Sequence, residues 1–409
     1  MNRRIKIGVV GGGAAGMAAA ITAVRRGAEV TILEGGERLG RKILSTGNGK
    51  CNLGNRNLSV QDYYTSYPKR MESWLNAIST TDVIDFFREL GLLIKEKNGY
   101  LYPLSEQASS VLDVLRFGVK ELGVEIVTEC KIRYIRKENG GIRIEGADKS
   151  YLFDKVILAC GGKAAPKTGS DGSGFKLAKQ IGHSIAPTVP ALVQLQCEEE
   201  YFKAVAGVRT EAMITIRSGG ANLCERGELQ LTQQGISGIP VFQLSRNVNY
   251  LLREKERVEA VIDLLPDLSR EEWERIMMSR SILLRGRTLE EYFTGILNKK
   301  LMLLFIKLAG LKATDAADNT SREALSRVFS YCKEWRVHII GSNSYESAQV
   351  TAGGVRLEEI SDTFESGKMQ GVYLIGEMLD VDGRCGGYNL HWAWCSGIIA
   401  GRAVTDTER

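Results

Sequence analysis

The sequence contains few prolines, few histidines and no closely spaced pair of cysteines. Seven prolines against 45 glycines in 409 residues favour tight turns and close backbone contacts over rigid linkers. None of the eight cysteines forms a C-x-x-C pair, and their spacing fits no zinc site. Because a chain of this length buries a large core without disulfides, we expect reduced thiols and a cytoplasmic protein.

A strong excess of charge and a long apolar run are also missing. The net charge of +5 is small for this length, and the cations are spread along the chain, so we expect no nucleic-acid partner. The apolar run at 301–311 is too short to span a bilayer and contains Lys307, so we expect a buried helix and no membrane contact. The basic and apolar start of the chain imitates a signal peptide, but three consecutive glycines interrupt it. A small-molecule substrate is the expected partner, and the oligomeric state stays open.

The hydrophobic pattern changes along the chain in the order α/β, β-rich, helical and α/β again. Residues 5–10 and 29–34 predict buried strands on either side of a helix over 14–26, which together make a βαβ unit. We therefore predict an α/β fold in which a Rossmann-like domain is interrupted by a β-rich, barrel-like domain that carries a helical subdomain. The predicted boundaries are 1–189 with 347–409 for the first domain, 190–265 with 328–346 for the second, and 266–327 for the helical subdomain.

A G-x-G-x-x-G motif follows the first predicted strand directly, at Gly11, Gly13 and Gly16. Its glycines allow a tight turn, contact between the backbone and a pyrophosphate, and close packing of helix on strand. The start of the following helix presents free amides to phosphate oxygens. Glu34 ends the next predicted strand, where a carboxylate accepts hydrogen bonds from an adenosine ribose. Because a carboxylate disfavours the 2′-phosphate of NADP, the motif predicts FAD or NAD.

The segment GRKILSTGNGKCN, residues 40–52, favours FAD over NAD. A loop that follows the ribose-binding carboxylate must lie along the extended dinucleotide toward its far end. Free amides together with Arg41, Lys42 and Lys50 suit phosphates and the polar edge of a flavin, and the glycines allow the main chain to contact a flat ring. A nicotinamide cofactor that exchanges in each turnover has less need of such a wrap, so the loop predicts a tightly held FAD.

Three stretches of the sequence resemble one protein family. They are VGGGAAGMAAA, GRKILSTGNGKCN, and TAGGV followed by GVYLIGEMLDVDGRCGGYNLHWAWCSGIIAG. These stretches resemble the HI0933-like, or BaiN-like, NAD(P)/FAD-dependent oxidoreductases, bacterial flavoproteins with a two-dinucleotide-binding-domain fold. The resemblance covers nearly the whole chain, including GELQLTQQGISGIP in the inserted region. It implies that the interrupted Rossmann-like domain binds FAD and that the protein is an FAD-dependent oxidoreductase. One position departs from the family, since His391 stands where glutamine is frequent.

The resemblance also assigns cofactor-binding roles. The glycine motif would hold the ADP half of FAD and the following loop the flavin half, while Ile132, in a predicted strand, would contact the adenine through its main chain. The helix after residue 387 would direct its N-terminus at the flavin, where it stabilises negative charge on the reduced ring. No metal site is expected. The cofactor-binding set is Gly11, Gly13, Ala14, Ala15, Gly16, Glu34, Arg41, Lys42, Ser45, Gly47, Asn48, Lys50, Cys51, Asn52, Ile132, Ala159, Gly161, Gly376, Glu377, Gly386, Gly387, Tyr388, Asn389 and Leu390.

Few residues qualify for proton transfer. A flavin accepts or donates hydride, so the protein needs to position the substrate and to supply or remove a proton. His391, Cys51 and Tyr388 adjoin the segments assigned to the flavin, and they are our catalytic candidates. Each has a structural alternative, in which it only packs its loop. A redox disulfide would require Cys51 and Cys385 to meet, which the sequence does not determine.

The resemblance implies two substrate types. One reaction is reduction of an unsaturated or keto compound, such as a bile-acid intermediate, with NAD(P)H. The other is oxidation of a small amine, such as aminoacetone, with oxygen. A second G-x-G-x-x-G is missing, so any NAD(P)H would bind transiently near the flavin. Two alternatives of other classes stay open: an FAD-dependent RNA-modifying enzyme, which requires a basic patch, and a redox-sensing flavoprotein without turnover.

Overall fold

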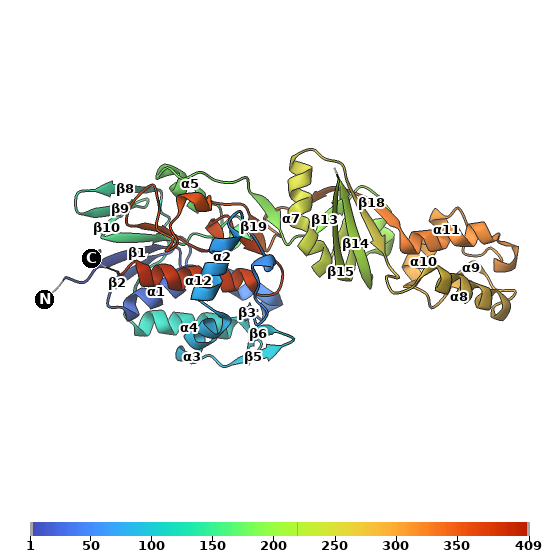
Figure 1. The fold of residues 1–409 in the computed structure, drawn as a ribbon, viewed down its shortest axis with the longest axis horizontal. Helices are drawn as coiled ribbons and strands as arrows, with labels where there is room; N and C mark the ends of the chain where they lie inside the picture. The colour runs from blue at the N-terminus through green and yellow to red at the C-terminus, as the bar shows by residue number, and fades with distance from the viewer. Residues whose placement is uncertain (1–2, 219, 407–409) are drawn as a thin grey trace. The chain divides into compact units, whose positions relative to one another are not determined.

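The computed structural model describes residues 3–218 and 220–406, and the chain divides into two compact units. Unit 1 consists of Met1–Pro190 together with Tyr345–Arg409, and unit 2 is Ala191–Ser344. In Figure 1 the blue-to-green first part of the chain and its red last part belong to unit 1, and the yellow and orange segments belong to unit 2. One unit is therefore assembled from both ends of the chain.

A parallel β-sheet forms the centre of unit 1. Its strands lie in the order β20-β11-β1-β2-β7, and each neighbouring pair is parallel. Strand β1 is buried except at its first residue, as expected where both faces of a sheet are covered. The predicted Rossmann-like architecture is confirmed. The strands are β1 (Lys6–Val10), β2 (Glu29–Leu33), β7 (Glu125–Val127), β11 (Lys155–Leu158) and β20 (Val372–Leu374).

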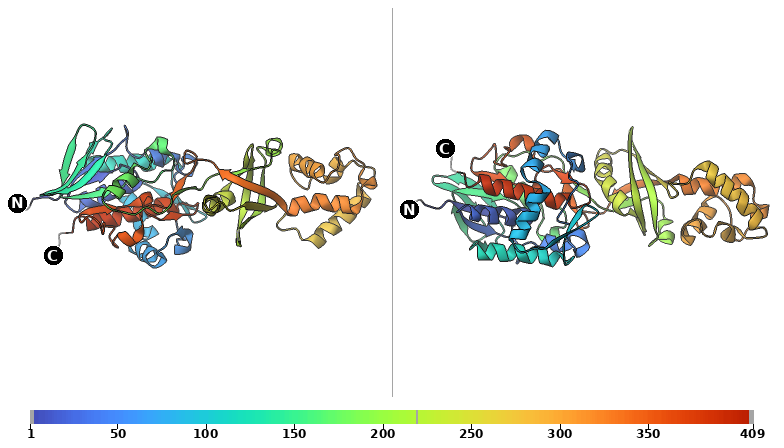
Figure 2. Two further views of the ribbon diagram at one scale, coloured as in Figure 1. Left: turned by 90° about the horizontal axis from the view of Figure 1, so that it is seen from above. Right: turned by 60° about the horizontal axis from the view of Figure 1, so that its bottom comes forward.

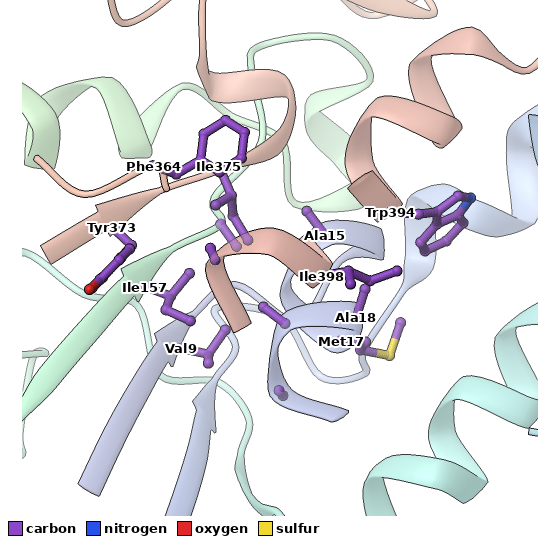
Figure 3. Close-up of a cluster of buried hydrophobic side chains, with 14 of the residues drawn as sticks. Val9, Ala15, Met17, Ala18, Ile157, Phe364, Tyr373, Ile375, Trp394 and Ile398 are labelled. Atoms are coloured by element: carbon purple, nitrogen blue, oxygen red, sulfur yellow. The ribbon is translucent and has the colours of Figure 1, made fainter. Parts of the chain in front are cut away.

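Two helices from opposite ends of the chain pack against each other in unit 1. They are α1 (Ala14–Arg25), which follows the glycine motif, and α12 (Tyr388–Ala403). The right-hand view of Figure 2 shows α12 in red alongside α1 in dark blue. In the close-up of Figure 3, Ala15 of α1 and Ile398 of α12 belong to one buried cluster with Val9 of β1. The last helix therefore completes the core around the first βαβ unit.

Glycines allow these two helices to approach each other very closely. A Cβ atom on Gly397 would lie 2.5 Å from the carbonyl oxygen of Ala15, and one on Gly401 would lie 2.6 Å from that of Ala19. Both distances are shorter than any real contact of a Cβ atom with backbone. The position of α12, and of the loop before it, is thus fixed relative to the glycine motif.

The prediction of a strand through Ile132 is wrong, because the chain between Val127 and Tyr134 is not a strand. The chain leaves β7 after Val127 and enters β8 only at Tyr134, and Glu129 between them has a φ of 53°. The amide of Cys130 donates to the carbonyl of Glu34 at 2.8 Å, so this segment bonds to the end of β2 instead of continuing a ladder. Ile132 therefore lies in an irregular connection beside the end of the sheet.

The remaining elements of unit 1 cover the sheet and its edges. The 3-10 segment η1 (Arg41–Gly49) is interrupted at Thr46, Gly47 and Asn48, which have non-helical dihedral angles. The helices are α2 (Pro68–Ala77), α3 (Thr80–Glu89), α4 (Ala108–Glu121) and α5 (Ser173–Gln180), and the short strands are β3 (Gly54–Asn55), β4 (Tyr63–Tyr64), β5 (Ile94–Lys97), β6 (Tyr100–Pro103), β8 (Tyr134–Glu138), β9 (Gly141–Glu145), β10 (Ser150–Phe153), β12 (Val189–Ala191), β19 (Val350–Ala352) and β21 (Asp382–Gly383).

Unit 2 contains a closed barrel, which confirms the barrel-like fold predicted for the inserted region. Its six strands lie in the order β13-β16-β15-β14-β17-β18, and all neighbours are antiparallel. Closure leaves no free sheet edge, which removes a template for aggregation. The strands are β13 (Leu195–Cys197), β14 (Arg209–Ser218), β15 (Ala221–Thr232), β16 (Gly235–Ser237), β17 (Val258–Asp263) and β18 (Trp335–Ser342).

Helices complete unit 2. Within the predicted helical subdomain, residues 289–308 form two helices, and Gly295, with a φ of 88°, lies between them. Within the described residues, none of the helices combines the length and the apolar character needed to cross a membrane. The helices of unit 2 are α6 (Phe202–Val205), α7 (Ile239–Arg253), α8 (Arg270–Leu283), α9 (Leu289–Phe293), α10 (Lys299–Leu308) and α11 (Arg322–Lys333).

Candidate functional site

A long cavity lies at the carboxyl ends of the parallel strands in unit 1. Val10 ends β1, Glu34 follows β2 and Ala159 follows β11, and all three line it. Open α/β sheets bind ligands at this edge, because the loops after the strands leave a crevice there. Segments far apart in the sequence, from Gly11 to Ala393, share this one cavity.

Close packing of the first turn requires two of the three glycines of the motif. Gly11 has a φ of 102°, and a Cβ on it would lie 2.5 Å from the carbonyl oxygen of Ala159. A Cβ on Gly16 would lie only 2.0 Å from the carbonyl oxygen of Gly11. By contrast, a Cβ on Gly13 would meet no described atom within 4 Å, and Gly13 lines the cavity. Gly13 therefore leaves room for a ligand, whereas Gly11 and Gly16 leave room for the protein itself.

Glu34 is held in place by main-chain amides on both sides. Its Oε2 accepts a hydrogen bond from the amide of Gly12, and its Oε1 accepts one from the amide of Gly36, each at 2.8 Å. A carboxylate has about four lone-pair positions, so each oxygen retains acceptor capacity for a ribose hydroxyl. The side chain is thus oriented before any ligand arrives.

The loop after Glu34 brings cations to the same cavity. Arg41 and Lys42 both line it. Lys42 Nζ lies 2.6 Å from Glu377 Oε2, and Glu377 Oε1 accepts a hydrogen bond from the amide of Thr351 at 3.0 Å. In the described part of the chain no carboxylate pairs with Arg41. The Arg41 guanidinium is therefore available to an anionic group, while Lys42 ties the loop to the C-terminal segment.

The second half of this loop contains four residues in the left-handed region. Gly47, Asn48, Gly49 and Cys51 have φ values of 55°, 53°, 82° and 55°. Such turns direct neighbouring amides to one side of the chain and suit polar or anionic groups of a ligand. The glycines make the conformation accessible at low cost.

His391 lies outside the cavity lining and is completely buried. Its Nε2 is 3.2 Å from the carbonyl oxygen of Ile78, and Nδ1 has no hydrogen-bond partner among the described residues. Burial lowers the pKa of His391 to about 4, so the ring is neutral at physiological pH.

The Cys51 thiol is likewise buried, and it also lies outside the lining. Desolvation raises its pKa to about 12, so the reactive thiolate is scarce at neutral pH. Cys385 is only partly buried, and none of the eight cysteines, all of which lie among the described residues, forms a disulfide. The structure therefore does not join Cys51 and Cys385 in a disulfide.

Tyr388 is the most accessible of the three catalytic candidates. It begins α12, and the next two residues, Asn389 and Leu390, line the cavity. Its hydroxyl accepts a hydrogen bond from Asn55 Nδ2 at 3.2 Å, and burial raises its pKa to about 12. The phenol is thus half-buried, oriented and protonated at neutral pH.

The residues predicted to bind the cofactor fall into two groups. Those that line the cavity are Gly11, Gly13, Ala14, Ala15, Glu34, Arg41, Lys42, Ile132, Ala159, Gly161, Gly376, Glu377, Asn389 and Leu390. Those outside its lining are Gly16, Ser45, Gly47, Asn48, Lys50, Cys51, Asn52, Gly386, Gly387 and Tyr388. The second group, Gly16 apart, comes from the loop 45–52 and from the start of α12. We call these two segments the flavin end, and the motif glycines Gly11, Gly13 and Gly16 together with Glu34 the adenosine end.

Several cavity residues are missing from the sequence-based set. The most extensive group is the segment 166–171, which lies between β11 and α5 and which we call the strap. Glycines and polar residues directly before a helix indicate a loop that can contact a ligand, and this was the available sequence signal for the strap. No periodic pattern marks these residues. Cys160, Gln349, Val350 and Trp392 also line the cavity.

The residues present fit an extended dinucleotide. Gly13 leaves space beside the helix N-terminus for a pyrophosphate, Glu34 is oriented for a ribose, and Arg41 lines the same cavity without a carboxylate partner among the described residues. Fold and site together define an FAD-dependent oxidoreductase of the Rossmann type.

Comparison with known proteins then gives the family. The model of the HI0933-like protein Rossmann domain matches residues 5–403, and the chain belongs to this family. The chain is 40% identical over 410 residues to the 3-dehydro-bile acid Δ(4,6)-reductase of Clostridium scindens, with 99% of this chain and 100% of that protein covered. It is 30% identical to the ribosomal RNA dihydrouridine synthase of Haemophilus influenzae, over 97% of this chain and 98% of that protein.

Among solved structures, the 3-ketosteroid Δ1-dehydrogenase of Sterolibacterium denitrificans in complex with 1,4-androstadiene-3,17-dione has a similar fold. The TM-score is 0.50 with 12% sequence identity, and the match covers 98% of this chain and 99% of that one. At this identity the likeness concerns the fold alone.

Proposed function

We propose that the chain reduces a carbon–carbon double bond conjugated to a carbonyl group in a small organic substrate of the 3-oxo bile-acid type. The observation that carries the proposal is the 40% identity, over the full length of both chains, to an enzyme named for reduction of 3-dehydro bile acids at Δ(4,6). An oxidoreductase site with an oriented phenol beside the cavity supports the same chemistry.

In such a reduction the β-carbon of the conjugated system accepts a hydride and the α-carbon accepts a proton. FAD, when bound, supplies the hydride. The chain must then bind the cofactor, orient the substrate and hold the proton. We assign FAD binding to the cavity-lining residues of the predicted set, and contacts with the flavin half to the loop 45–52 and to the segment 386–390.

Tyr388 is the proton donor in this proposal. Burial holds its pKa near 12, so the hydroxyl carries its proton at neutral pH. The hydrogen bond from Asn55 Nδ2 favours the phenolate that remains after transfer. The nearby Asp62 carboxylate interacts with the Tyr388 hydroxyl and offers a route for its reprotonation. Cys51 and His391, which are buried outside the lining, take the structural roles left open by the sequence.

Reduced nicotinamide is the proposed electron donor, bound transiently near the flavin. We also propose that the protein is cytoplasmic, because eight cysteines without a disulfide suit a reducing compartment.

A second candidate substrate is a uracil base in ribosomal RNA. It is favoured by the 30% identity to ribosomal RNA dihydrouridine synthases of Haemophilus influenzae and Escherichia coli, each over at least 95% of this chain. The C5=C6 bond of uracil is conjugated to a carbonyl, so the same bond type is reduced. The two candidates therefore differ in the substrate and not in the reaction.

One experiment separates these substrates. The FAD-loaded protein is reduced anaerobically by light and mixed separately with a 3-oxo-Δ4 bile acid and with unmodified ribosomal RNA, and flavin reoxidation is followed by absorbance. We expect rapid reoxidation and a product two mass units heavier with the bile acid. Reoxidation by RNA alone would select the second candidate, and reoxidation by neither compound would overturn the proposed reaction. Parallel mixing of the oxidised protein with NADH and NADPH identifies the donor.

A further inference from the structure

The small sheet β3-β6-β5 of unit 1, labelled in Figure 1, presents two tyrosines on one face. Side chains alternate along β6, so Leu101 is buried whereas Tyr100 is 38% exposed. Tyr102 follows two residues after Tyr100 and therefore shares its face. Across the ladders, Tyr100 is opposite Asn55 of β3, and Tyr102 is opposite Lys95 of β5. We call Tyr100 and Tyr102 the tyrosine face.

One end of the tyrosine face meets the proposed proton donor. A Cβ on Gly386 would lie 2.9 Å from Cε2 of Tyr388 and 3.0 Å from Cε1 of Tyr100, so both rings contact the same glycine. Asn55 Nδ2 donates to the carbonyl of Gly386 at 3.3 Å and to the Tyr388 hydroxyl at 3.2 Å. A molecule that lies on Tyr100 is therefore beside Tyr388.

The other end of the tyrosine face carries an excess of positive charge. Glu106 Oε1 lies 2.6 Å from Lys95 Nζ, and Glu106 Oε2 lies 3.0 Å from Lys50 Nζ. Hydrogen bonds from Lys95 and Lys50 lower the pKa of Glu106 to about 2, so one negative charge faces two positive charges at neutral pH. Each ammonium has three donors and keeps some of them for a further anion.

This charged group adjoins the second tyrosine. Tyr102 is opposite Lys95 in the ladder of β5 and β6. Burial raises the pKa of Tyr102, and Lys50 and Glu106 make smaller contributions to it, so both charged side chains lie near the Tyr102 hydroxyl. The order along the surface is therefore Tyr388, Tyr100, Tyr102 and then the lysines.

The dimensions of this row suit a flat and rigid molecule. A strand rises about 3.4 Å per residue, so Tyr100 and Tyr102 are about 7 Å apart along β6. Aromatic rings offer large apolar surfaces at a small cost in conformational entropy. The row therefore fits a fused apolar ring system that has its reacting carbonyl at one end and an anionic group at the other.

We propose that the tyrosine face positions the substrate, with the fused rings on Tyr100 and Tyr102 and the side-chain carboxylate of the bile acid on Lys95. The reacting end of the substrate then lies at Tyr388. The inference rests on the proposed function, because it places a substrate of the 3-oxo bile-acid type. It adds that the enzyme prefers the free acid to a neutral compound with the same rings.

A 3-oxo-Δ4 bile acid and its methyl ester test the role of charge. The concentration dependence of flavin reoxidation, followed by stopped flow in the reduced FAD-loaded protein, gives an apparent affinity and a limiting rate for each compound. Lys95→Gln should weaken the affinity for the acid about 3- to 5-fold, the range of an exposed ion pair, and leave that for the ester unchanged. Glu106→Gln removes a competing carboxylate and should strengthen the affinity for the acid by a similar factor.

Glu96→Gln is the matched control for Glu106→Gln. Glu96 is an exposed carboxylate of the same hairpin, and it pairs with Arg56 at 3.0 Å. It is opposite Leu101 in the ladder, so it belongs to the other face of the sheet. Its substitution should leave the affinities for acid and ester unchanged.

Tyr100→Ala tests the role of the rings. It should weaken the affinities for acid and ester alike, about 10-fold, because both compounds lose the same apolar contact. Tyr100→Phe keeps the ring and should restore most of this affinity. The loss should lie in the apparent affinity and not in the limiting rate, since Tyr100 positions the substrate and transfers no proton.

Equilibrium dialysis with a saturated 3-oxo bile acid, which cannot be reduced, measures binding without turnover in the same variants. Affinity that depends on Lys95 and Tyr100, without reoxidation by the unsaturated acid, supports this inference and overturns the proposed reaction. Reoxidation with affinities that none of these variants changes overturns the inference and keeps the reaction.

Equal effects of the charge variants on acid and ester also overturn the inference. Absence of bile-acid binding to the wild type overturns it together with the proposed substrate. In that case, slower reoxidation by ribosomal RNA in Tyr100→Ala would assign the tyrosine face to a stacked base instead.

Discussion

The two ends of the predicted cofactor site are held in place by different kinds of contact. At the adenosine end, the position of each group is set by backbone: Gly11 and Gly16 touch main-chain oxygens, and Glu34 is fixed by two amides. At the flavin end, side-chain contacts join segments that are distant in the sequence. Asn55 Nδ2 donates to the hydroxyl of Tyr388, the first residue of α12, and Lys42, just before the loop 45–52, pairs with Glu377. Backbone sterics allow few substitutions, whereas side-chain contacts can be exchanged. We infer that the adenosine end serves cofactor binding and that the flavin end is where substrate specificity can change.

The largest expected effect is at the adenosine end. Gly16→Ala places a Cβ 2.0 Å from the carbonyl oxygen of Gly11, so α1 must move away from the turn. We expect FAD affinity to fall more than about 100-fold, together with a lower thermal midpoint, as for an overpacked core. Gly13→Ala is the matched comparison, since its Cβ meets no described atom within 4 Å. It should keep the thermal midpoint and weaken FAD binding only. Normal FAD binding by Gly16→Ala would contradict the assignment of backbone control to this end.

At the flavin end the largest effect should be on turnover. Tyr388→Phe removes the proposed proton donor and keeps the ring, and loss of a general acid typically lowers the rate about 100- to 10,000-fold. FAD affinity should change little, because the hydroxyl lies outside the cavity lining. Stopped-flow reoxidation of the reduced protein by substrate measures the step, and fluorescence titration measures FAD binding. A variant with a wild-type rate would remove Tyr388 from the mechanism.

His391 lies beside the flavin end, and we expect it to contribute to folding stability rather than to catalysis. Its pKa is lowered to about 4 in the folded chain, below the ordinary value of 6.5, so the unfolded chain binds more protons between these values. Its contribution to stability is therefore complete above pH 6.5 and is lost as the pH falls toward 4, by about 3 kcal/mol in total.

His391→Gln should flatten this part of the pH dependence, which thermal melts at pH 4 to 7 measure. Turnover at pH 7 should be near that of the wild type. A large loss of turnover with an unchanged pH profile of stability would return His391 to the catalytic candidates.

The smallest expected effect comes from Glu34→Gln. The amide keeps one acceptor oxygen but loses the charge, so FAD affinity should fall about 10-fold, the range of one charge-assisted hydrogen bond. The affinity for FMN, which lacks the adenosine half, should be unchanged. An equal loss for both flavins would show that the two ends are not independent.

The geometry of the adenosine end could be predicted from the sequence because it is determined by residues that are close together in the chain. Three glycines at fixed spacing, a strand before them and Glu34 after the next strand determine the geometry through contacts within one βαβ unit. The barrel was predictable as a β-rich insertion from its alternating pattern. The loop 45–52 was assigned to the flavin from its own glycines and cations, whereas the part played by the start of α12 depended on the family resemblance, since no local rule brings residue 388 beside residue 55.

Other features depend on tertiary packing and could not be predicted. The burial of His391 follows from packing of α12 against Gly54 and the carbonyl of Ile78, and a helix that is apolar on most sides gives no periodic signal for it. Ile132 left its predicted strand because Cys130 bonds to the end of β2. The strap was missed because glycine-rich turns mark a loop without indicating what it covers.

The close contact between α1 and α12 also affects the order of events during synthesis. The last helix fills the space beside Ala15 and Ala19, so the first βαβ unit has its complete core only after residues 388–403 have been synthesised. Unit 2 lies wholly within the earlier part of the chain and has its own hydrophobic cluster. We therefore expect a chain shortened before residue 388 to be made without flavin.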